Sequence, residues 1–162
     1  MAITKAKKAE ISEKVEGIVR DSAAVVFVNF HGLPITVEKA LREKLKEEGV
    51  TYYVAKKTLV ERVLGASGVA GEQPSLEGEL AIAYGADPVS PARGVYQFAK
   101  SGDGKLTIRG GIFEGTFKSA AEMTEIAQIP GMHELRGMFA NVINSPIQGL
   151  VVALDAIAQK KA

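Results

Sequence analysis

The chain has 162 residues, of which 46% are hydrophobic and 24% charged, which is the composition of a globular protein and not of a disordered one. It contains no cysteine, so disulfides and thiolate metal sites are excluded. The formal net charge is only +1, but residues 1–62 carry 12 Lys and Arg against 9 Asp and Glu. The first third of the chain is therefore where an anionic partner is expected.

Apolar periodicity predicts alternating strands and helices over residues 1–129. Strands are predicted at 24–30, 50–54, 79–84 and 105–113. Helices are predicted at 4–20, 36–48, 58–64, 89–100 and 119–128. We expect Thr36 to cap the second helix, a bulge at Gly110–Gly111, and a capping box of Ser119 and Glu122. The predicted fold class is α/β, with a mixed sheet flanked by helices.

The segment Ile129–Gly131 (IPG) then interrupts the pattern, and two helices are predicted after it, at 132–144 and 146–160. Ser145 is the expected N-cap of the last helix and Pro146 its first residue. The sequence therefore predicts an α/β domain over 1–129 and a helical C-terminal extension over 130–162.

The N-terminus lacks the apolar segment of a secretory signal, and no uninterrupted apolar run approaches the roughly 20 residues of a membrane span. We expect a cytoplasmic protein without a membrane partner.

Motifs of enzyme chemistry are missing from the sequence. It has no phosphate-binding loop of the G-x-x-x-x-G-K-[ST] type and no G-x-S-x-G nucleophile elbow. His31 and His133 are the two histidines, far apart in the chain, so a metal site is not expected. We predict no catalytic residues, no metal and no cofactor.

Two clusters of lysines stand at the starts of predicted helices in the basic third of the chain. Lys5, Lys7 and Lys8 open the first helix, and Lys56 and Lys57 open the third. Cations are slightly unfavourable at a helix N-terminus, whereas free N–H groups there bind phosphate. Either these lysines are solvated surface residues, or several such sites bind a nucleic-acid backbone. Arg62 could extend that surface, and Phe30 and His31 could either stack on a base or pack in a turn.

The last predicted helix is amphipathic. At 100° per residue its apolar stripe comprises Ile147, Leu150, Val151, Leu154, Ile157 and Ala158. The stripe could fold back on the chain's own domain, dock on a partner protein or, less favourably because the polar face has few cations, lie on a membrane surface.

Several segments in order resemble the family of bacterial large-subunit ribosomal protein ten, the stalk-base protein. They are the basic first helix, VVFVNFHGLPITVEKALREKLKEEGVTYYVAKKTLVERVL, LAIAYGADPVSPARGVYQFAK, GGIFEG and SPIQGLVVALDAIAQKK. The most specific element is the G-L-x-x-x-V helix, followed by a strand and [KR]-x-T-L. The resemblance covers essentially the whole chain.

The resemblance implies that the N-terminal domain binds large-subunit (23S) rRNA at the stalk base, beside ribosomal protein eleven. It implies that the C-terminal helix, through the stripe above, carries dimers of the acidic stalk protein seven/twelve, which recruit translational GTPases. It implies a cytoplasmic, non-catalytic ribosomal protein. By position, the RNA-facing residues would be Lys5, Lys7, Lys8, Phe30, His31, Gly32, Lys56, Lys57 and Thr58.

The chain departs from the family pattern at Lys57, where the family usually has asparagine. An ammonium group donates hydrogen bonds but accepts none, so attraction to phosphate is retained while a base-specific amide contact is not. A different hypothesis from the residues alone is an α/β metabolic enzyme that forms a homodimer through its last helix.

Overall fold

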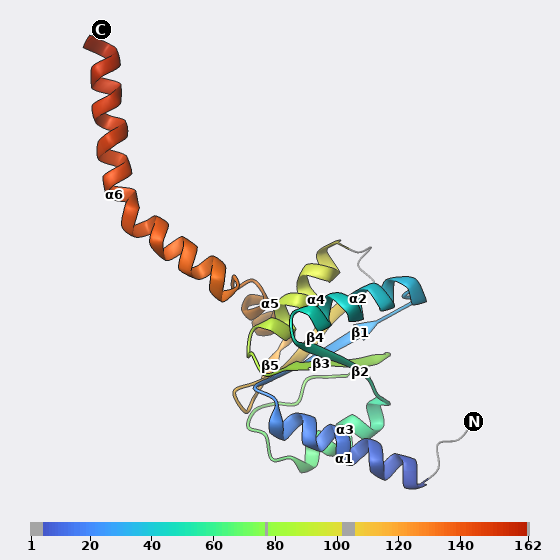
Figure 1. Cartoon of the computed structure of the whole chain (residues 1–162). Helices are drawn as coiled ribbons and strands as arrows, with labels where there is room; N and C mark the ends of the chain where they lie inside the picture. Colours follow the sequence, from blue (N-terminus) through green and yellow to red (C-terminus); the bar gives the residue numbers. More distant parts are fainter. Residues whose placement is uncertain (1–4, 77, 102–105, 162) are drawn as a thin grey trace. The chain divides into compact units, whose positions relative to one another are not determined.

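The computed structural model describes residues 5–76, 78–101 and 106–161, and it divides into two compact units, Met1–Ile129 and Pro130–Ala162. The first unit is a five-stranded sheet with helices on both faces (Figure 1). The second unit is a single long helix.

The sheet of the first unit is built around strand β1. The strands are β1 (Ala24–Phe30), β2 (Val50–Val54), β3 (Leu80–Gly85), β4 (Leu106–Phe113) and β5 (Thr116–Ser119). Their order is β2-β3-β1-β4-β5, and each neighbouring pair is antiparallel. Residues 24–28 are all buried, because helices cover both faces of the central strand. This double burial explains why the segment is continuously apolar and does not alternate.

Helices join the strands by two interlocked crossovers. The helices are α1 (Lys5–Asp21), α2 (Ile35–Glu47), α3 (Lys57–Ala66), α4 (Ser90–Ser101) and α5 (Ala120–Ala127). Helix α2 connects β1 to the parallel strand β2, with β3 inserted between them, and α4 connects β3 to β4 across β1. As a result, the carboxyl ends of β1 and β2 lie at the same end of the sheet.

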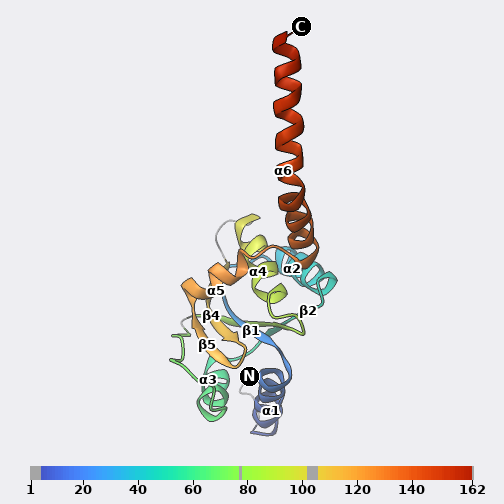
Figure 2. The same cartoon turned by 90° about the vertical axis from the view of Figure 1, so that its left-hand side faces the viewer.

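The two faces of the sheet have separate cores. Val26 and Val28 point to the face covered by α2, α4 and α5, where Leu41, Leu45 and Met123 are fully buried. On the opposite face, covered by α1 and α3 (Figure 2), the core contains Val15, Ile18, Val25, Phe27, Val60 and Leu64. The alternation of side chains along β1 thus divides its apolar residues between two layers of helices.

The α/β class predicted from the sequence is confirmed. The capping box is also present: the Ser119 side chain accepts a hydrogen bond from the Glu122 N–H, and the Glu122 carboxylate accepts one from the Ser119 N–H. The β1–β4 register shifts between Phe27 and Val28, which pair with Gly110 and Ile108, so the irregularity lies at Arg109, next to the predicted Gly110–Gly111. The predicted N-cap at Thr36 is wrong. The N-cap of α2 is Pro34, two residues earlier, and its carbonyl accepts the first hydrogen bonds of the helix.

Strand β5 was not predicted. It pairs with β4 across a tight turn in which Glu114 (φ 49°) and Gly115 (φ 73°) both have left-handed backbone conformations. Two consecutive positive φ values are typical of the type I′ hairpin turn, for which Asn-Gly is the usual sequence. A four-residue strand after Glu-Gly gives a weak sequence signal.

Helix α6 (Met132–Lys161) corrects another prediction. The chain does not end one helix at Asn144 and start a new one at Pro146. A single 30-residue helix includes Pro146 in its interior. Proline removes one backbone hydrogen bond and crowds the carbonyl four residues earlier, which a bend can accommodate without ending the helix. Figure 1 shows α6 bending part-way along its length.

Candidate RNA and partner interfaces

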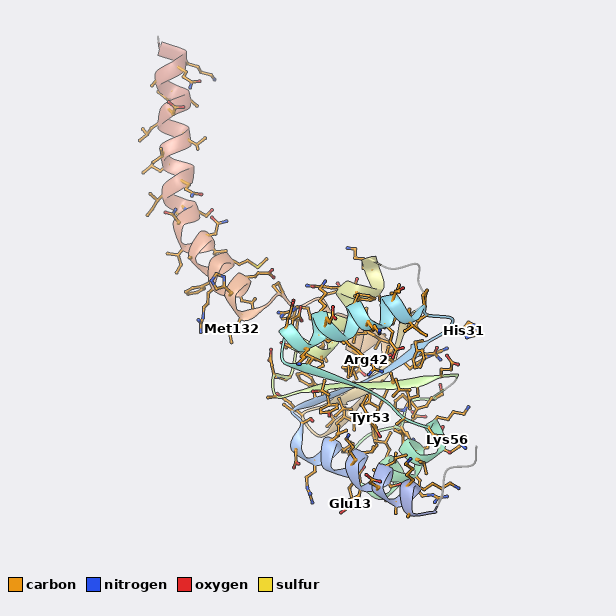
Figure 3. All side chains as sticks on the ribbon, turned by 45° about the vertical axis from the view of Figure 1, so that its right-hand side comes forward. Glu13, His31, Arg42, Tyr53, Lys56 and Met132 are labelled. Carbon is orange, nitrogen blue, oxygen red and sulfur yellow. The ribbon has the colours of Figure 1, made fainter. Side chains whose placement is uncertain are left out.

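One end of the sheet gathers several predicted RNA-facing residues. Asn29 at the end of β1 pairs with Leu80, and Val54 at the end of β2 pairs with Ala81, so the two strands end beside the start of β3. His31 and Lys56 follow these strand ends and are both exposed. Figure 3 shows them at the same end of the sheet. Residues that are 25 positions apart in the sequence therefore contribute to one surface.

The start of α3 offers backbone donors together with cations. Lys56 is the N-cap, no side chain caps the helix, and its first turn contains no acidic residue. The Lys56 carbonyl accepts hydrogen bonds from the N–H groups of Leu59 and Val60. The preceding N–H groups of Lys57 and Thr58 have no acceptor within a helix of this geometry. Lys57 and Thr58 are also exposed, so an external anion can reach both the amides and the ammonium groups.

The basic start of α1 lies at the same end of the first unit. Lys7 and Lys8 are exposed, whereas the side chain of Lys5 lies outside the described residues. Helix α1 packs against α3, and a short connection reverses the chain from α1 into β1. The first turns of α1 therefore lie toward the carboxyl end of β1 (Figure 1). Arg62, on α3, is exposed as well.

The turn after β1 contains both accessible and inaccessible residues. Gly32 is exposed and has a left-handed conformation, with a φ of 59°, which glycine adopts without steric cost. Phe30 is half-buried and packs against the core under α2 and α4. Of the two alternatives for Phe30, packing in the turn is the one that the contacts support, while His31 is free to contact a ligand.

On α2, unlike at the starts of α1 and α3, a cation is paired with a neighbouring carboxylate. The Arg42 guanidinium lies 2.6 Å from the Glu38 carboxylate and 5.5 Å from the centre of the Tyr52 ring. Burial, with Glu38 nearby, raises the pKa of the Tyr52 phenol to about 12. Arg42 is thus largely neutralised within the chain, so the exposed lysines of α1 and α3 are better suited to bind an external anion.

Helix α6 carries the apolar stripe predicted for partner binding. Ile147, Leu150 and Leu154 are 62%, 63% and 58% exposed, and Val151, Ile157 and Ala158 are exposed as well. A lone helix cannot cover its own side chains, so the stripe is buried only where another surface packs against it.

Two sequence families match the chain. Residues 3–100 match the family described as Ribosomal protein L10, and residues 129–162 match the Ribosomal protein uL10 C-terminal region. The chain belongs to the ribosomal protein L10 family. Members are structural proteins of the large ribosomal subunit and are not enzymes, which makes this chain a component of the cytoplasmic ribosome.

Individual relatives resemble the chain over nearly its full length. Three such relatives, from different bacteria, are each named large ribosomal subunit protein uL10. The relative from Fusobacterium nucleatum is 38% identical over 164 residues, covering 98% of this chain and 96% of the relative. The one from Shouchella clausii is 36% identical over 156 residues, covering 96% and 93%. The one from Pelotomaculum thermopropionicum is 31% identical over 173 residues, covering 100% and 98%. Both the domain and the helical extension are thus shared with these relatives.

The described residues contain no cluster of metal ligands. No group of three or more His, Asp or Glu side chains among them could hold a metal ion. One hollow, of about 660 Å³, is lined by Glu72, Arg109, Phe117 and Ser119 among others. In it the Ser119 hydroxyl lies 3.0 Å from the Glu122 carboxylate, a contact that belongs to the capping box of α5.

Sequence reasoning missed the apolar residues of the first half of α6. Met132, Met138, Phe139, Val142 and Ile143 are each more than half exposed, and Leu135 is 39% exposed. Their spacing of three and four residues is the signal that could have revealed them. At 100° per residue this first stripe is rotated by roughly 90° from the stripe of the second half. The helix therefore presents apolar side chains along its whole length, on two overlapping faces.

Helix α6 also meets a simple criterion for a membrane span. Met132–Lys160 is long enough, and an 18-residue window reaches a mean hydropathy of 1.3. The sequence between Arg136 and Asp155 nevertheless contains Asn141, Asn144 and Gln148, which are costly to place in lipid without partners. These polar side chains disfavour a membrane span for α6.

Proposed function

We propose that the chain forms the base of the ribosomal stalk and that its two units bind different partners. The first unit binds large-subunit rRNA through the basic end of its sheet, and α6 anchors dimers of the acidic stalk protein. The observation that carries this proposal is the contrast between the two surfaces: exposed lysines beside free helix amides in one unit, and an exposed apolar stripe in the other.

The RNA surface is supported by convergence of cations from separate elements. Lys7 and Lys8 come from α1, and Lys56, Lys57 and Arg62 come from the β2–α3 connection and α3. Contacts of this kind neutralise phosphates and release counterions, so the affinity is strongly salt-dependent. In this proposal His31 and Thr58 contact sugar or base groups within the same surface. Ribosomal protein eleven would bind the same rRNA region beside this unit.

The proposed binding of stalk dimers by α6 is supported by the amount of apolar surface that this helix exposes. Full burial of the five larger side chains of the Ile147–Ala158 stripe contributes about 7–15 kcal/mol as an upper bound. Ordering and association cost about 4–15 kcal/mol, so a stable complex needs good packing along the helix. The additional apolar residues at 132–143 supply surface for more than one dimer. The bound dimers would in turn recruit translational GTPases.

The binding of stalk dimers by α6 is tested with two aspartate variants on opposite faces of this helix. Leu154→Asp places a charge within the stripe, and we expect it to weaken binding of purified stalk dimers about 100-fold or more. Val152→Asp is the matched control, because Val152 is 68% exposed but lies outside the stripe, so its binding should remain near that of the parent chain. Equal binding by both variants, measured by calorimetry, would contradict the proposed binding of stalk dimers by α6.

The RNA surface is tested by salt titration. Replacing both Lys56 and Lys57 with glutamine should weaken binding to a stalk-base transcript of 23S rRNA by about 25- to 60-fold at 0.1 M salt, because two phosphate contacts are lost. The control replaces Lys44 and Lys46, two exposed lysines in the last turn of α2, and should leave the salt slope unchanged. If the slope is the same for both double variants, Lys56 and Lys57 do not contact RNA.

A further inference from the structure

A lysine outside the predicted surface is held in place by an aromatic ring. The Lys14 ammonium of α1 lies 4.7 Å from the centre of the Tyr53 ring on β2. Tyr53 is half-buried and packs against the core that α1 and α3 cover. A ring fixed by the core gives a flexible lysine side chain a defined position, because the ring face attracts cations.

Lys14 also shares a flank of α1 with one of the predicted RNA-facing lysines. Lys7 and Lys14 are seven residues apart, which places them about 10 Å apart along the same side of the helix. Glu13 points away from the sheet, whereas Tyr53 and Lys56 lie on the side of α1 that faces it (Figure 3). Tyr53 precedes Lys56 by three residues, so Lys14 contacts the strand that leads to the second group of predicted RNA-facing lysines.

The comparison with Arg42 shows what is unusual about Lys14. Both cations lie over a tyrosine of β2, on opposite faces of the sheet, but Arg42 is also paired with Glu38 at 2.6 Å. Among the described residues, no ion pair includes Lys14, although it is exposed. The ring of Tyr53 thus positions the charge of Lys14 without neutralising it.

We propose that Lys14 is a phosphate contact of the RNA surface and that Tyr53 is its positioning residue. This inference rests on the proposed binding of rRNA by the first unit, and it extends that surface from the start of α1 along its flank to β2. The occupied ring face means that Tyr53 orients the lysine and does not stack on a base. Lys14 therefore contributes backbone affinity and no sequence preference.

The first test is the salt dependence of Lys14→Gln. Loss of one phosphate contact should lower the salt slope by about 0.7–0.9 and weaken binding of the 23S stalk-base transcript about five- to eightfold at 0.1 M salt. Lys46→Gln, an exposed lysine of α2, is the control and should bind like the parent chain. Parent-like affinity and slope for Lys14→Gln would overturn the inference while leaving the proposed RNA function intact. A parent chain that does not bind the transcript would instead contradict the proposed function.

The second test separates positioning from a purely structural role. Tyr53→Phe keeps the ring and should bind like the parent chain, whereas Tyr53→Leu should lose part of the affinity that Lys14 provides. In the Lys14→Gln background, Tyr53→Leu should have no further effect, because the lysine that the ring positions is already gone. An equal loss from Tyr53→Leu in both backgrounds would show that the ring acts through the fold or through the RNA itself, and would overturn the positioning role.

Discussion

The two units use apolar side chains in opposite ways. In the first unit, Phe27, Leu41 and Ile82 are completely buried between a sheet and two layers of helices. In α6, residues of the same kind, such as Phe139 and Leu150, are 67% and 63% exposed. Burial of apolar surface stabilises a protein only where partners of complementary shape exist. The first unit supplies these partners from its own elements, whereas in the function proposed above α6 finds them in the stalk dimers.

The largest contrast is expected for truncation of one phenylalanine in each unit. Phe27→Ala leaves a cavity in the central strand and should lower the free energy of unfolding by about 3–5 kcal/mol. Phe139→Ala removes an exposed side chain and should change it by less than about 0.5 kcal/mol. Urea unfolding followed by circular dichroism measures both. Similar losses for the two variants would mean that α6 is part of the folded core.

A glycine in each unit gives the next contrast. A Cβ atom at Gly111 of β4 would lie 2.5 Å from the Val25 carbonyl oxygen and 2.9 Å from the Met123 methyl group. Gly111→Ala should therefore destabilise the first unit by about 1–3 kcal/mol, since the neighbouring strand cannot move away freely. Thermal unfolding measures the loss, and unchanged stability would show that the sheet is more compliant than its packing indicates.

Gly149 of α6 should respond in the opposite direction. Nothing lies within 4 Å of a Cβ atom at this position, and the residue is helical. Gly149→Ala should stabilise the helix by about 1 kcal/mol and tighten binding of stalk dimers by up to about fivefold, because less ordering is needed on binding. Helicity by circular dichroism and affinity by calorimetry should rise together. Weaker binding would indicate that a partner backbone approaches Gly149 closely.

The smallest effect concerns acid stability and belongs to the first unit alone. Hydrogen bonds from the Ser119 N–H and hydroxyl, together with Lys118, hold the pKa of Glu122 below its ordinary value of 4.5. The stabilisation from this carboxylate is therefore present above pH 4.5 and is lost as the pH falls through the lowered pKa. In Glu122→Gln this part of the pH dependence should disappear. Parallel pH profiles of unfolding for the variant and the parent chain would contradict this role.

The features that the sequence predicted correctly depend on residues close together in the chain. The buried strand at 24–30, the capping box of Ser119 and Glu122 and the stripe from Ile147 to Ala158 depend on near neighbours or on simple periodicity. Pro146 was misinterpreted, because proline can start a helix or bend one, and residue type alone does not distinguish the two.

The contact between Lys14 and Tyr53 could not be predicted from the sequence, since it joins residues of α1 and β2 that only the folded sheet brings together. The same limit applies to the convergence of His31 and Lys56. Both residues lie at one end of the sheet because β3, inserted between β1 and β2, is antiparallel to each and so makes the two strands parallel. Periodicity does not reveal this strand order.

The division of labour between the two units is tested most directly by native mass spectrometry of the full chain mixed with the 23S stalk-base transcript and purified stalk dimers. The parent chain should form one complex that contains the RNA and several dimers. Leu154→Asp should keep the RNA and lose dimers, and the Lys56 and Lys57 double glutamine variant should keep the dimers and lose RNA. A homodimer of the parent chain through α6, or loss of both ligands together in either variant, would contradict the account.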